Sequence, residues 1–65
     1  MKLVISDMSC QHCVTRISDA LKGVAGVDTV NITLSDKLVE VTGSAAQSAI
    51  LDAIKGAGYS PSVVD

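Results

Sequence analysis

The chain has 65 residues, a formal net charge of −2 and a hydrophobic fraction of 48%. This length suits one small domain with an aliphatic core, in which Tyr59 is the sole Phe, Tyr or Trp. The charge provides no basic face for nucleic acid, and no apolar run reaches the length that a bilayer requires. We therefore expect residues 1–65 to form a single domain that binds no nucleic acid and is not embedded in a membrane.

The first predicted element is a strand from Lys2 to Ser6, in which Leu3 and Ile5 share one face because strand side chains alternate. After a loop at residues 7–12, apolar residues recur at helical spacing and predict a helix over about residues 11–24. The apolar face of this helix comprises Val14, Ile17, Leu21 and Val24. Its polar face, with Arg16 and Lys22, is either a docking patch or a solvated surface.

Two further strands are predicted around a tight turn. Val30, Ile32 and Leu34 alternate with polar residues, and a second alternating run covers residues 38–42. Two such runs around a short connection are typical of a hairpin. Residues 35–37 supply the turn, and we expect no further role for Asp36 and Lys37.

A second helix and a last strand complete the chain. Ser44 and Gln47 match a capping box, in which each side chain bonds to the backbone N–H of the other at the start of a helix. This helix extends to about Lys55. Its expected buried residues are Ala46, Ile50, Ala53 and Ile54. The last strand covers residues 59–64, where Pro61 suits an edge strand because proline cannot donate a hydrogen bond.

This order of elements, β-α-β-β-α-β, predicts the α+β fold class. We expect a ferredoxin-like sandwich, with a four-stranded antiparallel sheet and two helices on one of its faces.

Both cysteines and the single histidine lie between the first strand and the first helix, in Asp7-Met8-Ser9-Cys10-Gln11-His12-Cys13. The free N–H groups and the positive dipole end of a helix start favour a thiolate over a thiol. Two thiolates separated by two residues can close on one soft ion, which favours Cu(I) and allows Zn(II). A structural zinc site usually has four protein ligands. Because this segment offers two sulfurs and one imidazole, the ligand count favours Cu(I) on Cys10 and Cys13.

Three other functions of a Cys-x-x-Cys pair fit this sequence less well. A thiol–disulfide oxidoreductase also places this motif before a helix, but the chain is too short for a thioredoxin-like sheet and its helices. A disulfide across so small a loop would constrain little chain. Haem attachment requires histidine directly after the second cysteine, where Val14 stands. Free thiols and the absence of a signal-peptide pattern lead us to expect a cytoplasmic protein.

The Met8-x-Cys10-x-x-Cys13 motif, the order of elements and the length resemble the heavy-metal-associated domain family, and the resemblance covers essentially the whole chain. The Gly58-Tyr59 pair is similar to that of small soluble bacterial copper chaperones. The resemblance implies that Cys10 is the more exposed metal ligand and that Cys13 lies nearer the helix. It also implies that Tyr59, on a neighbouring loop, shields the thiolates or tunes metal release.

Four loop residues leave alternatives open. Asp7 departs from the family pattern, which usually has glycine there, and its carboxylate favours a harder ion such as Zn(II). Ser9 favours copper, because some zinc- and cadmium-exporting pumps carry an acidic residue in its place. His12 is a third ligand, a bridge in a metal-linked homodimer, a modulator of thiol acidity or an exposed loop side chain. Met8 is favoured as a core residue over a thioether ligand.

The resemblance implies a cytosolic copper chaperone without enzymatic activity. It would carry one Cu(I) and transfer it by thiolate ligand exchange to a copper-transporting P-type ATPase. One alternative is an excised amino-terminal metal-binding domain of such an ATPase, although Met1 and an end just after the last strand favour a free-standing protein. The others are a carrier of zinc, cadmium or mercury and, least favoured, a small dithiol oxidoreductase.

Overall fold

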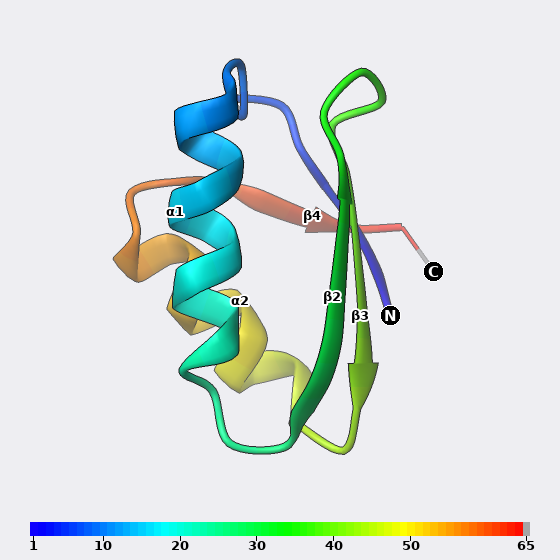
Figure 1. The fold of residues 1–65 in the computed structure, drawn as a ribbon. Coiled ribbons are helices and arrows are strands. Elements are labelled where there is room, and N and C mark those ends of the chain that lie inside the picture. Colours follow the sequence, from blue (N-terminus) through cyan, green and yellow to red (C-terminus); the bar gives the residue numbers. More distant parts are fainter. Residues whose placement is uncertain (65) are drawn as a thin grey trace.

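A computed structural model describes residues 1–64 of the chain. Its elements are β1 (Lys2–Ile5), α1 (Gln11–Lys22), β2 (Val27–Thr33), β3 (Leu38–Gly43), α2 (Gln47–Gly56) and β4 (Pro61–Val63). The strands form one antiparallel sheet in the order β2-β3-β1-β4. Both helices lie on the same face of this sheet (Figure 1). The ferredoxin-like arrangement predicted from the sequence is therefore confirmed.

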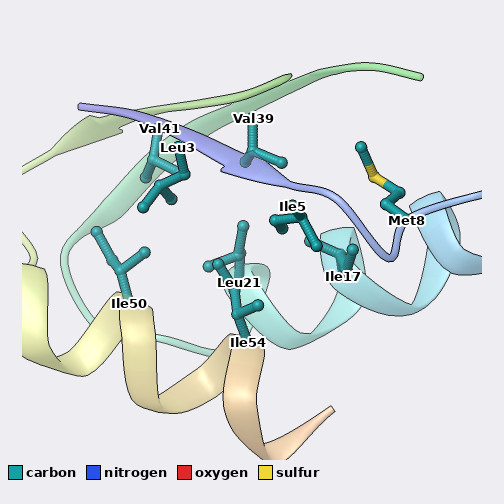
Figure 2. Close-up of a cluster of buried hydrophobic side chains, with 9 residues drawn as sticks. All are labelled: Leu3, Ile5, Met8, Ile17, Leu21, Val39, Val41, Ile50 and Ile54. Carbon is teal, nitrogen blue, oxygen red and sulfur yellow. The ribbon is translucent and has the colours of Figure 1, made fainter. Parts of the chain in front are cut away.

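The core fills the space between the sheet and the two helices (Figure 2). Leu3 and Ile5 are fully buried on one face of β1, as the strand alternation predicts. Helical spacing brings Ile17 and Leu21 of α1 to the same layer. The complete buried set is Leu3, Ile5, Met8, Ile17, Leu21, Val39, Val41, Ile50 and Ile54. Full burial of one such side chain contributes about 1.5–3 kcal/mol, which makes this layer the main stabilising feature of the fold.

The start of α2 differs from the predicted capping box. The residue that precedes the helix is Ala46, and no side chain caps it. Ala46 is exposed, although the sequence pattern predicted its burial. The backbone N–H groups of Ser44 and Ala45 donate instead to the carbonyl oxygen of Gly26, at 2.8 and 3.2 Å. These bonds hold residues 44–45 against the loop before β2, so the helix begins beyond them.

The strands also differ in length from the prediction. β2 begins three residues earlier than the alternating pattern suggested, because Val27 pairs with Gly43 across a register shift. β4 is limited to three residues. It lies at the edge of the sheet, next to β1 alone, which confirms the edge position expected for Pro61.

No helix within residues 1–64 is long and apolar enough to cross a membrane.

Candidate metal centre

The two cysteines lie where the chain passes from the β1–α1 loop into the helix. Cys10 is the residue directly before α1 and has an extended backbone. Its carbonyl oxygen accepts a hydrogen bond from the N–H of Val14, at 3.2 Å, so Cys13 lies in the first turn of the helix. The Cys10 side chain makes no capping bond to the helix backbone. Both sulfurs are therefore near the positive end of the helix dipole.

The side chain of Met8 anchors this loop in the hydrophobic core. This side chain is fully buried, at one end of the core cluster (Figure 2). The backbone N–H of Met8 donates to the carbonyl oxygen of Ile5, at 3.1 Å, which turns the chain directly after β1. The preference for Met8 as a core residue is confirmed by this burial.

The two sulfur atoms are close enough to share one ion. Cys10 is exposed and Cys13 is half-buried, and both are free thiols whose sulfurs are 3.1 Å apart. Two sulfurs on one zinc-like ion, at about 2.3 Å each, are separated by no more than ~4.6 Å. A small opening of the pair is therefore sufficient to admit a soft cation between the sulfurs.

The surroundings of Cys13 favour its thiolate form. A hydrogen bond with the Tyr59 side chain is the largest effect that lowers the pKa of Cys13 to about 6. The Cys10 side chain and the backbone of Ser9 lower this pKa further, whereas desolvation opposes them. The same contact raises the pKa of Tyr59, because the phenol that donates to a thiolate is harder to ionise. Near pH 7, Cys13 is therefore mostly ionised and ready to bind a cation.

Replacement of Tyr59 by phenylalanine is expected to move the titration of Cys13 towards higher pH. Below about pH 6 the thiolate of the native chain is protonated and reacts slowly, and above that pH it reacts fast. Without the phenol, the midpoint is expected to rise because the largest stabilising contact is lost. The rate of Cys13 alkylation against pH, followed by peptide mass spectrometry, measures this midpoint. Identical midpoints in both proteins would contradict the assigned role of Tyr59.

The structure does not assemble His12 or Asp7 with the two sulfurs into a larger ligand set. Within residues 1–64, no group of three or more His, Cys, Asp and Glu side chains is placed to hold a metal ion. His12 is exposed. Asp7 is exposed too, and its Oδ1 accepts a hydrogen bond from the backbone N–H of Ser60, at 3.3 Å. Among the described residues, the cysteine pair is therefore the candidate metal site.

Arg16 and Lys37 make contacts that the sequence pattern did not indicate. The prediction that Lys37 has no role beyond the turn was wrong, because its Nζ donates to the carbonyl oxygen of Ser6 at 2.9 Å. Arg16 is not simply solvated, because its Nη2 donates to the carbonyl oxygen of Ala57 at 3.4 Å. Its guanidinium carbon also lies 6.0 Å from the centroid of the Tyr59 ring. No local pattern signals these contacts, because the bonded residues are 31 and 41 positions apart in the chain.

Known proteins resemble this chain in sequence and in fold. Residues 2–60 match the heavy-metal-associated domain family. The superoxide dismutase 1 copper chaperone of Kluyveromyces lactis is 40% identical over 52 residues, which cover 80% of this chain and 21% of that protein. Copper-transporting ATPase 1 of Rhizobium meliloti is 39% identical over 62 residues, which cover 92% of this chain and 8% of that protein. This chain therefore spans only a small part of either curated relative.

The fold is also shared with a solved structure. The CopZ metallochaperone matches with a TM-score of 0.90 and 31% identity, and the match covers 95% of this chain and 97% of that one. Here the two chains correspond over nearly their whole lengths.

Proposed function

The chain belongs to the heavy-metal-associated domain family, and from this premise we propose that it is a carrier of Cu(I). Residues 1–65 would act as a single domain, and the ion would be its cargo. The observation that carries the proposal is the pair of free sulfurs, 3.1 Å apart, at the start of α1. Relatives named as a copper chaperone and a copper-transporting ATPase support copper as the metal.

The donor set suits Cu(I) better than Zn(II). Soft thiolates select Cu(I), which accepts a low coordination number, whereas structural zinc is almost always held by four ligands. The described residues offer two sulfurs and no third metal-binding side chain grouped with them. The hydrogen bond from Tyr59 and the helix dipole keep Cys13 as a thiolate, so metal binding near pH 7 needs little proton release from that residue.

Transfer would proceed by associative ligand exchange. A thiolate of the recipient approaches the ion on the side of Cys10, which is the more exposed sulfur. A three-coordinate bridge forms, and one sulfur of this chain then leaves the ion. The recipient we propose is a similar domain of a copper-transporting P-type ATPase, reached in the cytoplasm. No bond within a substrate is made or broken, so the chain would act as a carrier without catalysis.

The proposal predicts one tightly bound Cu(I) per chain and weaker binding of Zn(II). An anaerobic titration, with a chromophoric Cu(I) chelator as competitor, gives both the stoichiometry and the affinity. Zinc is measured in the same way with a zinc chelator. Weak copper binding together with tighter zinc binding would contradict the proposal and favour a carrier of zinc, cadmium or mercury. The mass of the loaded protein in solution tests the alternative of a metal-bridged homodimer through His12.

A second candidate is a metal-binding domain excised from a longer ATPase. It is favoured by the match to Copper-transporting ATPase 1, which covers 92% of this chain but 8% of that protein. The length of the native transcript distinguishes the two, because an excised domain requires a much longer reading frame. A dithiol oxidoreductase is the least favoured reading. Disulfide reductase activity at physiological glutathione would support it and count against a carrier.

A further inference from the structure

The segment that carries Tyr59 is held from two sides by residues of the first quarter of the chain. This Tyr59 segment, residues 57–60, connects α2 to β4. On one side, Asp7 accepts a hydrogen bond from the N–H of Ser60, at 3.3 Å. On the other side, Arg16 donates to the carbonyl oxygen of Ala57, at 3.4 Å, and its guanidinium carbon lies 6.0 Å from the Tyr59 ring centroid.

We propose that Asp7 and Arg16 are positioning residues that hold the Tyr59 segment so that the phenol stays against Cys13. Neither residue would touch the metal. Their effect on metal retention would pass through Tyr59, whose side chain is the largest influence that lowers the pKa of Cys13. The link to metal retention rests on the proposed carrier function, whereas the positioning itself does not.

The segment needs such anchors because its own backbone is permissive. Gly58 has a φ of +97°, and a Cβ built on it would meet no atom within 4 Å. Glycine loses more conformational freedom on ordering than any other residue. The N–H groups of Gly58 and Tyr59 bond to the last turn of α2, at 3.0 and 3.2 Å, so they tie the segment to that helix only. Besides the contact of Tyr59 itself with Cys13, the contacts of Asp7 and Arg16 tie the segment to the cysteine loop and to α1.

The contact of Asp7 also gives this carboxylate a role other than metal binding. Its Oδ1 is engaged by a backbone donor, and no metal-holding group among residues 1–64 includes it. Asp7 therefore couples the cysteine loop to the Tyr59 segment.

The test uses the fluorescence of Tyr59, which is the single tyrosine in a chain without tryptophan. Quenching by acrylamide, a neutral probe, reports how accessible the ring is in the metal-free protein. Asp7→Ala removes the acceptor, and Asp7→Asn keeps an oxygen acceptor without the charge. Arg16→Gln removes both the stacking cation and its bond to Ala57. Matched controls are Asp19→Ala and Lys22→Gln, which remove one exposed carboxylate and one exposed cation elsewhere on α1.

We expect Asp7→Ala and Arg16→Gln each to raise the population of molecules with a detached Tyr59 segment about two- to fivefold. This is the effect of losing one exposed hydrogen bond or cation–π contact. Quenching of Tyr59 then increases in both variants. Asp7→Asn and the two controls are expected to match the native protein. Unchanged quenching in Asp7→Ala and Arg16→Gln would overturn the proposal. Equal increases in Asp7→Asn and Asp7→Ala would overturn the hydrogen bond as its basis.

A second experiment measures the rate at which the copper-loaded protein loses Cu(I) to an excess of chelator. Faster loss from Asp7→Ala and Arg16→Gln, in the same order as their quenching, supports control of metal retention through Tyr59. Stronger acrylamide quenching of Tyr59 together with an unchanged rate of Cu(I) loss would show that Tyr59 does not control metal retention. If the native chain bound no copper, the carrier function would fail, and the metal-free fluorescence would still decide whether the two residues position Tyr59.

Discussion

Replacement of Cys13 by serine is expected to abolish tight Cu(I) binding. The change removes the sulfur whose pKa is lowered to about 6 and puts in its place a hydroxyl that stays protonated near pH 7. An oxygen donor is also a poor partner for a soft ion. Loss of a residue that merely orients a ligand costs about 10–100-fold in metal affinity, and loss of one of two ligands is expected to cost more. Cys10→Ser is expected to have the same outcome, since one sulfur then remains.

Chelator competition under anaerobic conditions measures the loss in both variants. Gln11→Ala is the matched control, because it alters an exposed residue between the cysteines and retains both sulfurs. Its affinity is expected to match that of the native chain. Since Cys10 and Cys13 lie outside the fully buried core, both serine variants are expected to fold, which far-UV circular dichroism verifies. Tight copper binding by either serine variant would contradict the two-sulfur site and make His12 the next residue to replace.

Replacement of Gly43 by alanine is expected to have the largest effect on stability. Gly43 ends β3 with a φ of +131°, a conformation that other L-residues rarely adopt. A Cβ there would lie against the carbonyl oxygen of Gly26 and 2.7 Å from the backbone nitrogen of Asp28. Both obstacles are backbone atoms, and the Gly26 carbonyl is already bonded to Ser44 and Ala45. The bend between β3 and α2 would therefore have to shift as a whole.

We expect Gly43→Ala to lower the free energy of unfolding by roughly 2–5 kcal/mol, from backbone strain and overpacking together. A domain of this size has a total stability of only about 3–10 kcal/mol, so the midpoint of urea unfolding should fall sharply. Gly56→Ala is the matched control, because a Cβ at Gly56 meets nothing within 4 Å and its φ is not positive. It is expected to raise stability by up to about 1 kcal/mol, since alanine is the better helix residue. Similar midpoints for the two variants would contradict the close approach at Gly43.

Features that depend on neighbours along the chain were predictable. The alternation of Leu3 and Ile5 and the helical spacing of Ile17 and Leu21 follow from the geometry of strands and helices, and these four residues are buried as predicted. The capping box at Ser44 is also a local pattern, yet it does not form. Its failure has a long-range cause, because the carbonyl oxygen of Gly26 binds the N–H of Ser44 at 2.8 Å. A local signal fails where a distant group offers the same backbone a better-placed partner.

The sequence by itself determined the order of elements and the position of two thiols at the start of a helix. Both follow from hydrophobic periodicity and residue spacing, which are properties of short stretches of chain. Residue spacing alone did not determine what surrounds the thiols. The tertiary structure brings Tyr59 to Cys13, which only the family resemblance had implied, and it joins Asp7 to Ser60 across 53 positions of the chain. These contacts exist because β1 pairs with β4 and both helices pack on the same face of the sheet, which brings the loops before α1 and after α2 together.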